Sequence, residues 1–346
     1  MRAAVFHGPG GSWPEKPMLI EEVPIPEIGP KEVLVKIAAC GVCRTDLEYL
    51  KVEGATPKAP PLILGHEPSG IVDAVGAEVS KFKLGDRVII SPTAPCLECT
   101  DCRRGNENLC QNMIVIGAEV DGAFAEYAKS HESAVYRLPD DLPLEESSVI
   151  TDAVGTSYHA IYDVAQVKPG DTVAIYGASG GLGLVCVQLA CGIGATVIGI
   201  GRKQWKLDKA REFGASVTLA TADCEKISKE VKRATGGGAD ISIDVTGIPD
   251  MMEEALKGAR PGGKVVEVGF GFHKFGIDIN RLMWNELKIM GSKNYNANDM
   301  PRILRLVQQG IVSLDKLVSH RFSLDEINEA YQMLDRGELL RAIVTP

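Results

Sequence analysis

The chain has 346 residues, of which 45% are hydrophobic and 24% charged, and its formal net charge is −9. This composition is typical of a folded globular protein and excludes a disordered, collagen-like or fibrous chain. The excess of acidic residues and the low aromatic content argue against nucleic acid or an anionic membrane as the main partner. At about 150 residues per domain, the length predicts two domains.

The first residues, Met1–Phe6, lead into a short apolar strand and a Gly/Pro turn, without the extended apolar segment of a secretory signal. We therefore expect a cytoplasmic protein whose nine cysteines are reduced, so that clustered cysteines indicate metal ligands rather than disulfides. Glycines interrupt the apolar stretch Leu182–Gly201, which favours a helix, a turn and a strand over a membrane span.

Residues 1 to about 140 are predicted to be β-rich, with no helix longer than about 10 residues. Short apolar or alternating runs are separated by Gly, Pro and Asp turns, and the clearest are Glu32–Ala38, Ser69–Val75, Arg87–Ser91 and Ala123–Lys129.

From about residue 155 to 295, predicted strands alternate with predicted helices. The strands are Thr172–Tyr176, Thr196–Ile200, Ser216–Leu219, Ile241–Val245 and Lys264–Val268. The helices are a run ending at Ala190, then Trp205–Phe213 and Met251–Lys257. This alternation requires right-handed crossovers and a parallel sheet, so we expect a doubly wound, nucleotide-binding α/β domain. The tail has helical patterns at Met300–Gln309 and Leu324–Arg336 and a last strand, Ala342–Val344, and it could return to complete the first domain.

Four cysteines follow the spacing Cys-x2-Cys-x2-Cys-x7-Cys, at positions Cys96, Cys99, Cys102 and Cys110. Four thiolates this close along the chain can bind one Zn²⁺ tetrahedrally, and a site with four protein ligands leaves no position for water or substrate. The loop is therefore predicted to hold a structural zinc. Four ordinary cysteines, two disulfides and an iron–sulfur cluster are the alternatives.

A second set of possible metal ligands lies in two short segments, Gly41–Asp46 and Gly65–Glu67. Cys43 offers a thiolate and His66 an imidazole, while the two carboxylates could orient them by hydrogen bonds. A third ligand and an open fourth position would make this a catalytic zinc site. Isolated Cys and His residues are more commonly packing residues, so these residue types alone leave both interpretations open.

A Gly-rich loop, Gly177–Gly183, follows the predicted strand Thr172–Tyr176 and opens a helix. In this context backbone N–H groups and a helix N-terminus bind the pyrophosphate of a dinucleotide. The strict Gly-x-Gly-x-x-Gly pattern is not met, so a turn without a ligand is the alternative. The candidate cofactor-binding residues of the loop are Gly177, Ser179, Gly180, Gly181 and Leu182.

Together these motifs resemble the zinc-dependent medium-chain alcohol dehydrogenase family. The segment from Gly65 to Val79 matches the family's zinc signature at every spacing, Gly41–Asp46 matches its first ligand segment, and the four-Cys loop matches its structural zinc lobe. Three further segments also match: Phe82–Val88, Gly122–Tyr127 and Arg341–Val344. The resemblance implies a GroES-like catalytic domain of residues 1–154 and 296–346, and a Rossmann cofactor-binding domain of residues 155–295.

The resemblance also implies the catalytic residues. The family's third zinc ligand falls on Asp152, so the catalytic zinc would be held by Cys43, His66 and Asp152, with Glu67 as a possible replacement ligand. The alternative is that Asp152 only begins a helix. Thr45 would pass the proton of the alcohol outward, and Glu48 or water would take the place of the family's relay histidine, or the relay would end early.

The cofactor contacts that the resemblance implies come from several segments. Arg44 and Arg341 would contact the pyrophosphate, and Thr156 and Val268 would line the nicotinamide. The alternative is that each arginine is an ion-pair partner at the surface.

The end of the strand Thr196–Ile200 bears on the choice of cofactor. The position at which NAD enzymes carry an acid for the adenosine ribose falls on Gly201, and Arg202 and Lys203 follow. Gly201 removes a charge that would repel a 2′-phosphate, and the two cations could bind its oxygens. This predicts NADP; the alternative is NAD, with the two cations as the solvated start of a helix.

The resemblance therefore implies an alcohol dehydrogenase with one catalytic and one structural zinc, transferring hydride between an alcohol and a nicotinamide cofactor. Bound zinc would act as a Lewis acid on the substrate oxygen. A polyol or sugar dehydrogenase is an alternative, and a catalytically silent zinc-binding scaffold is a remote one. We expect a small alcohol, aldehyde or ketone as substrate and a homotetramer, or a homodimer, in which the apolar region Lys264–Ile289 could pair across subunits.

Overall fold

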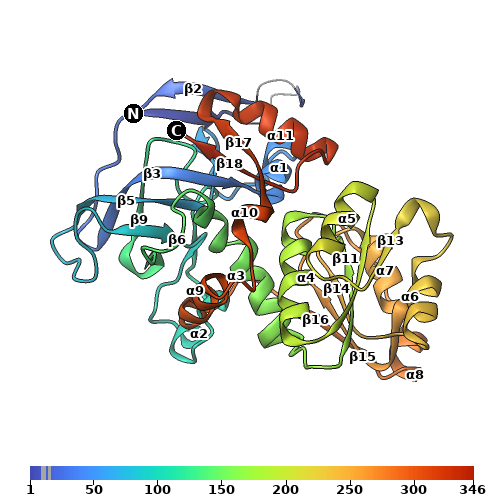
Figure 1. The fold of residues 1–346 in the computed structure, drawn as a ribbon. Coiled ribbons are helices and arrows are strands. Elements are labelled where there is room, and N and C mark those ends of the chain that lie inside the picture. Colours follow the sequence, from blue (N-terminus) through green and yellow to red (C-terminus); the bar gives the residue numbers. More distant parts are fainter. Residues whose placement is uncertain (9–12, 15–16) are drawn as a thin grey trace. The chain divides into compact units, whose positions relative to one another are not determined.

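The structure is a computed structural model that describes residues 1–8, 13–14 and 17–346 (Figure 1). These residues form two compact units. The first comprises Met1–Asp152, Asn296–Gln308 and Ser313–Pro346, and the second comprises Ala153–Tyr295 and Gln309–Val312. The C-terminal strands, red in Figure 1, therefore belong with the N-terminal part of the chain.

The first unit is built mainly on antiparallel strand pairs, although the last two strands of its larger sheet pair in parallel. One sheet has the order β2 (Met18–Glu22), β1 (Arg2–Phe6), β4 (Leu62–Ile63). The larger sheet has the order β10 (Val135–Arg137), β6 (Arg87–Ile90), β5 (Pro68–Val75), β3 (Glu32–Val42), β18 (Arg341–Thr345), β17 (Val318–Ser323). β9 (Tyr127–His131) also pairs with β3, and β7 (Thr93–Ala94) pairs with β8 (Ile114–Val115). The helices are α1 (Arg44–Lys51), α2 (Thr100–Arg103), α9 (Met300–Gln308), α10 (Leu314–Leu317) and α11 (Ile327–Arg336).

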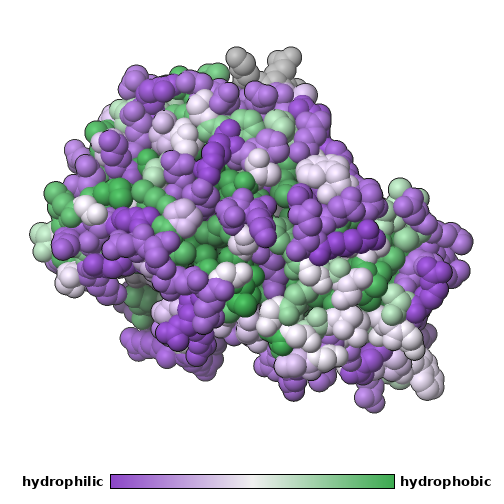
Figure 2. Space-filling model, viewed as in Figure 1, coloured by the Kyte–Doolittle hydropathy of each residue, from purple (hydrophilic) through white to green (hydrophobic). Residues whose placement is uncertain are grey.

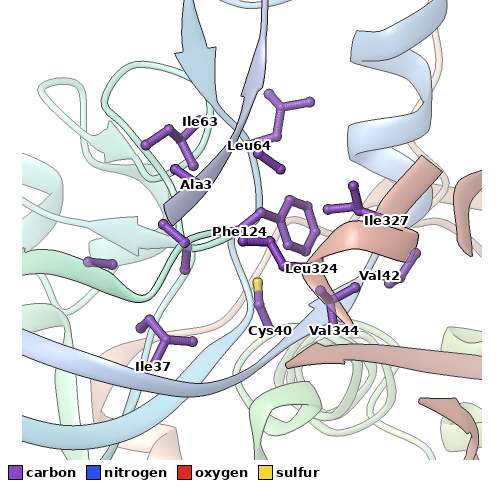
Figure 3. Close-up of a cluster of buried hydrophobic side chains, with 14 of the residues drawn as sticks. Ala3, Ile37, Cys40, Val42, Ile63, Leu64, Phe124, Leu324, Ile327 and Val344 are labelled. Atoms are coloured by element: carbon purple, nitrogen blue, oxygen red, sulfur yellow. The ribbon is translucent and has the colours of Figure 1, made fainter. Parts of the chain in front are cut away.

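The expected strand Ala123–Lys129 is only partly a strand, because β9 begins at Tyr127. The preceding residues instead bond to the loop that carries His66: Ala123 N–H donates to the Gly65 carbonyl at 2.9 Å, and Phe124 N–H donates to the Leu64 carbonyl at 3.0 Å. Figure 3 shows Phe124 in the core of this unit, beside Leu324 and Ile327. A buried aromatic ring and two backbone bonds thus fix the loop that precedes His66.

The second unit contains one parallel sheet, which confirms the predicted doubly wound fold. Its strands run in the order β13 (Val217–Ala220), β12 (Thr196–Gly201), β11 (Thr172–Tyr176), β14 (Ala239–Asp244), β15 (Ala259–Glu267), β16 (Lys288–Gly291). All five pairings are parallel. This is the Rossmann order, whose switch point between β11 and β14 is where such sheets bind dinucleotides.

The helices of this unit are α3 (Ala153–Tyr158), α4 (Gly181–Ile193), α5 (Gln204–Glu212), α6 (Ile227–Thr235), α7 (Pro249–Gly258) and α8 (Ile279–Trp284). Sequence patterning did not reveal α6, which buries only Ile227, Ser228 and Val231 among charged neighbours. No helix in the described part of the chain is long and apolar enough to cross a bilayer. Hydrophilic side chains cover much of the face shown in Figure 2.

Candidate active site and metal centres

Four potential metal ligands that are far apart in the sequence meet within the first unit. Cys43 is the N-cap of α1, directly after β3, while His66 and Glu67 lie between β4 and β5, and Asp152 is the last residue before α3. One ligand atom from each of the four lies within 4.8 Å of the others. The Cys43 Sγ is 3.4 Å from Asp152 Oδ2, and His66 Nε2 is 3.9 Å from the same oxygen.

The orientation of His66 is fixed by a carboxylate at its Nδ1 side. Its Nδ1 lies 3.1 Å from Asp46 Oδ1, and the Tyr331 hydroxyl donates to Asp46 Oδ2 at 2.8 Å. Burial by itself disfavours the imidazolium, but the charges of Asp46 and Cys43 outweigh it and raise the pKa of His66. Because Nδ1 faces Asp46, Nε2 faces the other ligands, as in metal-binding histidines held by a carboxylate.

Glu67 and Arg341 form a buried ion pair beside this cluster. The Arg341 guanidinium donates to Glu67 Oε1 and lies 3.8 Å from Asp152 Oδ2, and its side chain is only 7% exposed. Burial raises the pKa of Glu67 to about 7, although the charge of Arg341 opposes the shift. The second oxygen of Glu67, Oε2, is buried without a hydrogen-bond partner. The predicted pyrophosphate contact of Arg341 stays a prediction, since its guanidinium is engaged here with Glu67.

The cluster has the chemistry of a zinc site. A thiolate, an imidazole and a carboxylate are common zinc ligands, and tetrahedral bonds of 2.0–2.3 Å place ligand atoms about 3.3–3.8 Å apart. Burial, and then the charge of Asp152, raise the pKa of Cys43. Burial also acts to raise the pKa of Asp152, but its contacts with His66 prevail and hold it well below its usual range. A cation bound here would favour the thiolate form of Cys43.

The residues after Cys43 belong to α1. Thr45 Oγ1 lies 3.7 Å from Cys43 Sγ, which places this hydroxyl next to the ligand cluster, and its role in a proton relay stays a prediction. Arg44 pairs with Glu48 at 3.3 Å, one helical turn later. Glu48 is thus bound to the arginine that we expect to contact the cofactor.

The four-Cys loop brings its sulfurs together around a second site. Cys110 Sγ is 3.5 Å from Cys96 Sγ and 3.9 Å from Cys99 Sγ, close to the separation of about 3.8 Å expected of thiolates around one zinc. Backbone N–H groups point at the sulfurs, and those near Cys99 lower its pKa to about 6. Burial raises the pKa of Cys102 to about 12, and a bound cation would offset this. The residues thus fit a closed, structural zinc site.

The predicted phosphate loop has the required form. It joins β11 to α4, whose N-cap is Gly180, so the helix begins at Gly181 and Leu182 follows in its first turn. A side chain at Gly183 would place Cβ 2.2 Å from the Gly177 carbonyl oxygen, so only glycine allows this close contact between helix and loop. Backbone N–H groups at such a helix N-terminus bind phosphate.

Comparisons with known proteins agree with this geometry. Residues 29–140 match the alcohol dehydrogenase GroES-like domain, and residues 181–309 match the zinc-binding dehydrogenase family. The chain belongs to the zinc-dependent medium-chain dehydrogenase family. It is 38% identical to an alcohol dehydrogenase of Schizosaccharomyces pombe over 99% of this chain and 96% of the relative. It is 33% identical to the sorbitol dehydrogenase of Bacillus subtilis over 100% of this chain and 97% of the relative.

Solved structures show the same likeness. An NAD-dependent alcohol dehydrogenase is 31% identical, with a TM-score of 0.90 over the full length of both chains. Other solved relatives were determined with NADP and with NADH. The protein is therefore an oxidoreductase of this dehydrogenase family.

The structure of the dehydrogenase adds detail at the end of β12. Gly201 ends the strand, and a Cβ there would lie 2.5 Å from the Ser179 hydroxyl of the phosphate loop. The space that the missing side chain leaves is thus filled by Ser179. Arg202 is exposed and Lys203 caps α5. Lys206, which the sequence analysis missed, is buried, and burial and the charges of Lys203 and Arg202 lower its pKa to about 8.

The two residues expected to line the nicotinamide lie in the second unit of the dehydrogenase. Thr156 is buried in α3. Val268 follows β15, and its N–H donates to the Asp244 carbonyl at 2.8 Å. Their contacts with a cofactor remain predictions.

Proposed function

We propose that this dehydrogenase oxidises a small alcohol, or reduces the matching aldehyde or ketone, with a catalytic zinc held by Cys43, His66 and Asp152. The observation that supports this most is the meeting of one sulfur, one imidazole nitrogen and one carboxylate oxygen around a common point. When bound there, zinc supplies Lewis-acid activation of the substrate oxygen. Glu67 is a possible replacement ligand.

The residues of this chain have distinct roles in the proposal. Asp46, held by Tyr331, orients His66, and Arg341 neutralises Glu67. The Thr45 hydroxyl accepts the proton of the alcohol and passes it toward solvent. Because Glu48 is paired with Arg44, water is the simpler continuation of this relay.

We propose NADP as the preferred cofactor, although one solved relative is NAD-dependent. The absence of an acid at Gly201 and the three cations Arg202, Lys203 and Lys206 beside it support this choice. Ser179, whose hydroxyl faces Gly201, adds a neutral donor. The 2′-phosphate of NADP would accept charge-assisted hydrogen bonds from these cations.

The polyol alternative has its own support, since the sorbitol dehydrogenase of Bacillus subtilis is among the relatives.

The proposed function is tested by measuring initial rates with NADP and NAD on a panel of primary alcohols, secondary alcohols, sorbitol and xylitol. Turnover with simple alcohols and not with polyols supports an alcohol dehydrogenase. The reverse supports the polyol alternative, and no turnover with any pair in zinc-replete protein would contradict the proposed activity.

We also propose a cytoplasmic homotetramer, or a homodimer. β16 is the edge strand of its sheet, so its outer backbone groups can pair with another strand. The preceding segment exposes a series of large hydrophobic side chains: Phe270, Phe272, Phe275, Ile277, Ile279, Met283 and Trp284. Several exposed apolar side chains next to a sheet edge are typical of a subunit interface.

A further inference from the structure

Two acidic side chains lie side by side at the carboxyl edge of the parallel sheet, in the unit that contains neither four-residue metal-ligand cluster. Asp244 is the last residue of β14 and Glu267 is the last residue of β15, and the two are directly opposite in the parallel register. Their carboxyl groups are close enough for the charge of Asp244 to raise the pKa of Glu267. Asp244 is fully buried, so two negative charges here would be costly.

Each carboxyl group holds the turn that follows its own strand. Asp244 Oδ1 accepts from the Thr246 N–H at 2.8 Å and from the Thr246 hydroxyl at 2.7 Å. Glu267 Oε1 accepts from the Gly269 N–H at 2.7 Å. The two turns touch, since a Cβ on Gly269 would lie 2.0 Å from the Gly247 nitrogen.

These turns border the predicted cofactor site. A Cβ on Gly177, the first residue of the phosphate loop, would lie 2.8 Å from methyl carbons of Val245 and Thr246. Val268, which we expect to line the nicotinamide, lies between Glu267 and Gly269. The acid pair therefore supports both the phosphate loop and the nicotinamide side of the site.

One oxygen of the pair has no donor. Asp244 Oδ2 is buried without a hydrogen-bond partner, although Glu267 is its neighbour. Two carboxylates cannot bond to each other, because both only accept; a protonated carboxyl can donate. A proton on Glu267 satisfies Asp244 Oδ2 and removes one of the two charges.

We propose that Asp244 and Glu267 share one proton at neutral pH and act as positioning residues that clamp together the two turns beside the phosphate loop. The proton comes from solvent and returns to it when the pair ionises fully. The inference rests on the proposed function, because it assigns these turns to the dinucleotide site.

The titratable groups on the neighbouring elements do not account for a titration of this pair near neutral pH. β11 places Tyr176 opposite Asp244, and burial, with the charges of Glu254 and Asp244, raises the pKa of that phenol above its usual range. The Glu254 carboxylate of α7 is turned toward the Ser228 N–H. β16 places Gly291, which cannot ionise, opposite Glu267.

The pH range follows from the direction of the shift. Burial, and then the charge of Asp244, raise the pKa of Glu267 from 4.5 to about 8. A carboxyl group with a raised pKa in the folded state favours folding at low pH, and this advantage is lost as the pH rises from the ordinary range through the folded value. We therefore expect the link between Asp244 and Glu267, which holds the two turns together, to weaken progressively toward pH 8 and to be lost above it.

The test compares the full-length wild type with Glu267→Gln, whose amide can donate to Asp244 at every pH. NADH is the probe because it lacks the 2′-phosphate with which Lys206 would interact. From about pH 6 to about pH 10 the NADH Kd of the wild type should rise about tenfold, the equivalent of one lost hydrogen bond. The Tm without cofactor should fall over the same range. Both pH dependences should be reduced in Glu267→Gln.

Two further variants complete the experiment. Glu225→Gln changes an exposed acid of the same unit and should keep the wild-type profiles. Asp244→Asn removes the repelling charge, so its transition should move to lower pH, and this variant keeps the test valid if Glu267→Gln does not fold. Wild-type profiles of Kd and Tm in both Glu267→Gln and Asp244→Asn would overturn the inference. If NADH and NADPH bind at no pH, the proposed function fails, while the Tm profiles still test the proton pair.

Discussion

At the scale of single residues, the ligand cluster depends on a side chain far along the sequence. Tyr331 is 285 residues from Asp46, yet its hydroxyl holds the carboxylate that orients His66. The sequence could indicate Cys43, His66 and Asp152, because short motifs and a family resemblance place them. It could not indicate Tyr331, because a lone tyrosine on an amphipathic helix is indistinguishable from a packing residue.

Substitution of Asp152 tests the third ligand. Asp152→Ala should lose the catalytic metal and nearly all turnover, and it should keep cofactor affinity within about a few-fold because the phosphate loop is untouched. Asp152→Cys should retain zinc, since thiolate is also a zinc ligand. Zinc content by mass spectrometry and initial rates are the measurements. Full activity of Asp152→Ala would remove Asp152 from the site.

Tyr331→Phe should weaken zinc retention without removing a ligand. Loss of the hydroxyl leaves a buried oxygen of Asp46 without its donor, at a cost of about 1–3 kcal/mol. Loss of such outer partners typically lowers metal affinity about 10–100-fold. The measurement is zinc loss during chelator titration. Retention equal to that of the wild type would show that Asp46 does not need this bond.

Arg202→Ala should change the cofactor preference. Loss of a charge-assisted contact with a 2′-phosphate should lower kcat/KM for NADP about tenfold or more, and kcat/KM for NAD should change little. Lys229→Ala, which removes an exposed cation of α6, is the matched control. An NAD preference in the wild type, or an unchanged ratio in the variant, would contradict the NADP proposal.

At the scale of elements, the strands that are continuous apolar runs were predicted best. The predicted Thr172–Tyr176 is β11 without change, because four of its five residues are buried and all but Ala174 are of types that favour a strand. The helix α6 was missed because its few buried residues lie among charged ones. β9 begins late because residues 123 and 124 bond to the loop before His66, a tertiary contact that no local pattern contains.

The four-Cys loop should contribute stability rather than chemistry. Cys99→Ser removes one of four thiolates and should lower the Tm by about 5–10 °C, since each kcal/mol corresponds to about 2–4 °C in a domain of this size. Freshly folded protein should keep a rate per catalytic zinc close to that of the wild type. The measurements are thermal unfolding and initial rates on the same sample. Unchanged Tm together with lost activity would contradict the structural assignment.

At the scale of the whole molecule, the chain combines a mainly antiparallel unit that holds both proposed zinc sites with a unit built on a parallel sheet that holds the phosphate loop. The sequence could predict this two-unit organisation, because the motifs that are typical of each unit are short and lie in separate parts of the chain. The oligomeric state is harder to predict from the sequence, because a strand at a free sheet edge and a strand paired across subunits have similar residue types.

Assembly through β16 has a direct test. Met290 lies on this edge strand, and Met290→Arg should place a charge at the proposed interface and shift the protein toward smaller species. Sedimentation velocity of the wild type and the variant is the measurement. Ala222→Arg, at an exposed position after β13, is the control and should not change the assembly. A monomeric wild type would contradict the proposed oligomer.

We propose that Cys43, His66 and Asp152 of this dehydrogenase hold one zinc ion and that the four-Cys loop holds a second, structural one. The most direct measurement is an anomalous difference map, collected at the zinc absorption edge, from crystals of zinc-replete protein. We predict two peaks per chain, one among the sulfurs of the four-Cys loop and one bounded by Cys43 Sγ, His66 Nε2 and the Asp152 carboxylate. A map with no peak at the second position, in protein that turns over an alcohol, would contradict the assignment of these three residues as zinc ligands.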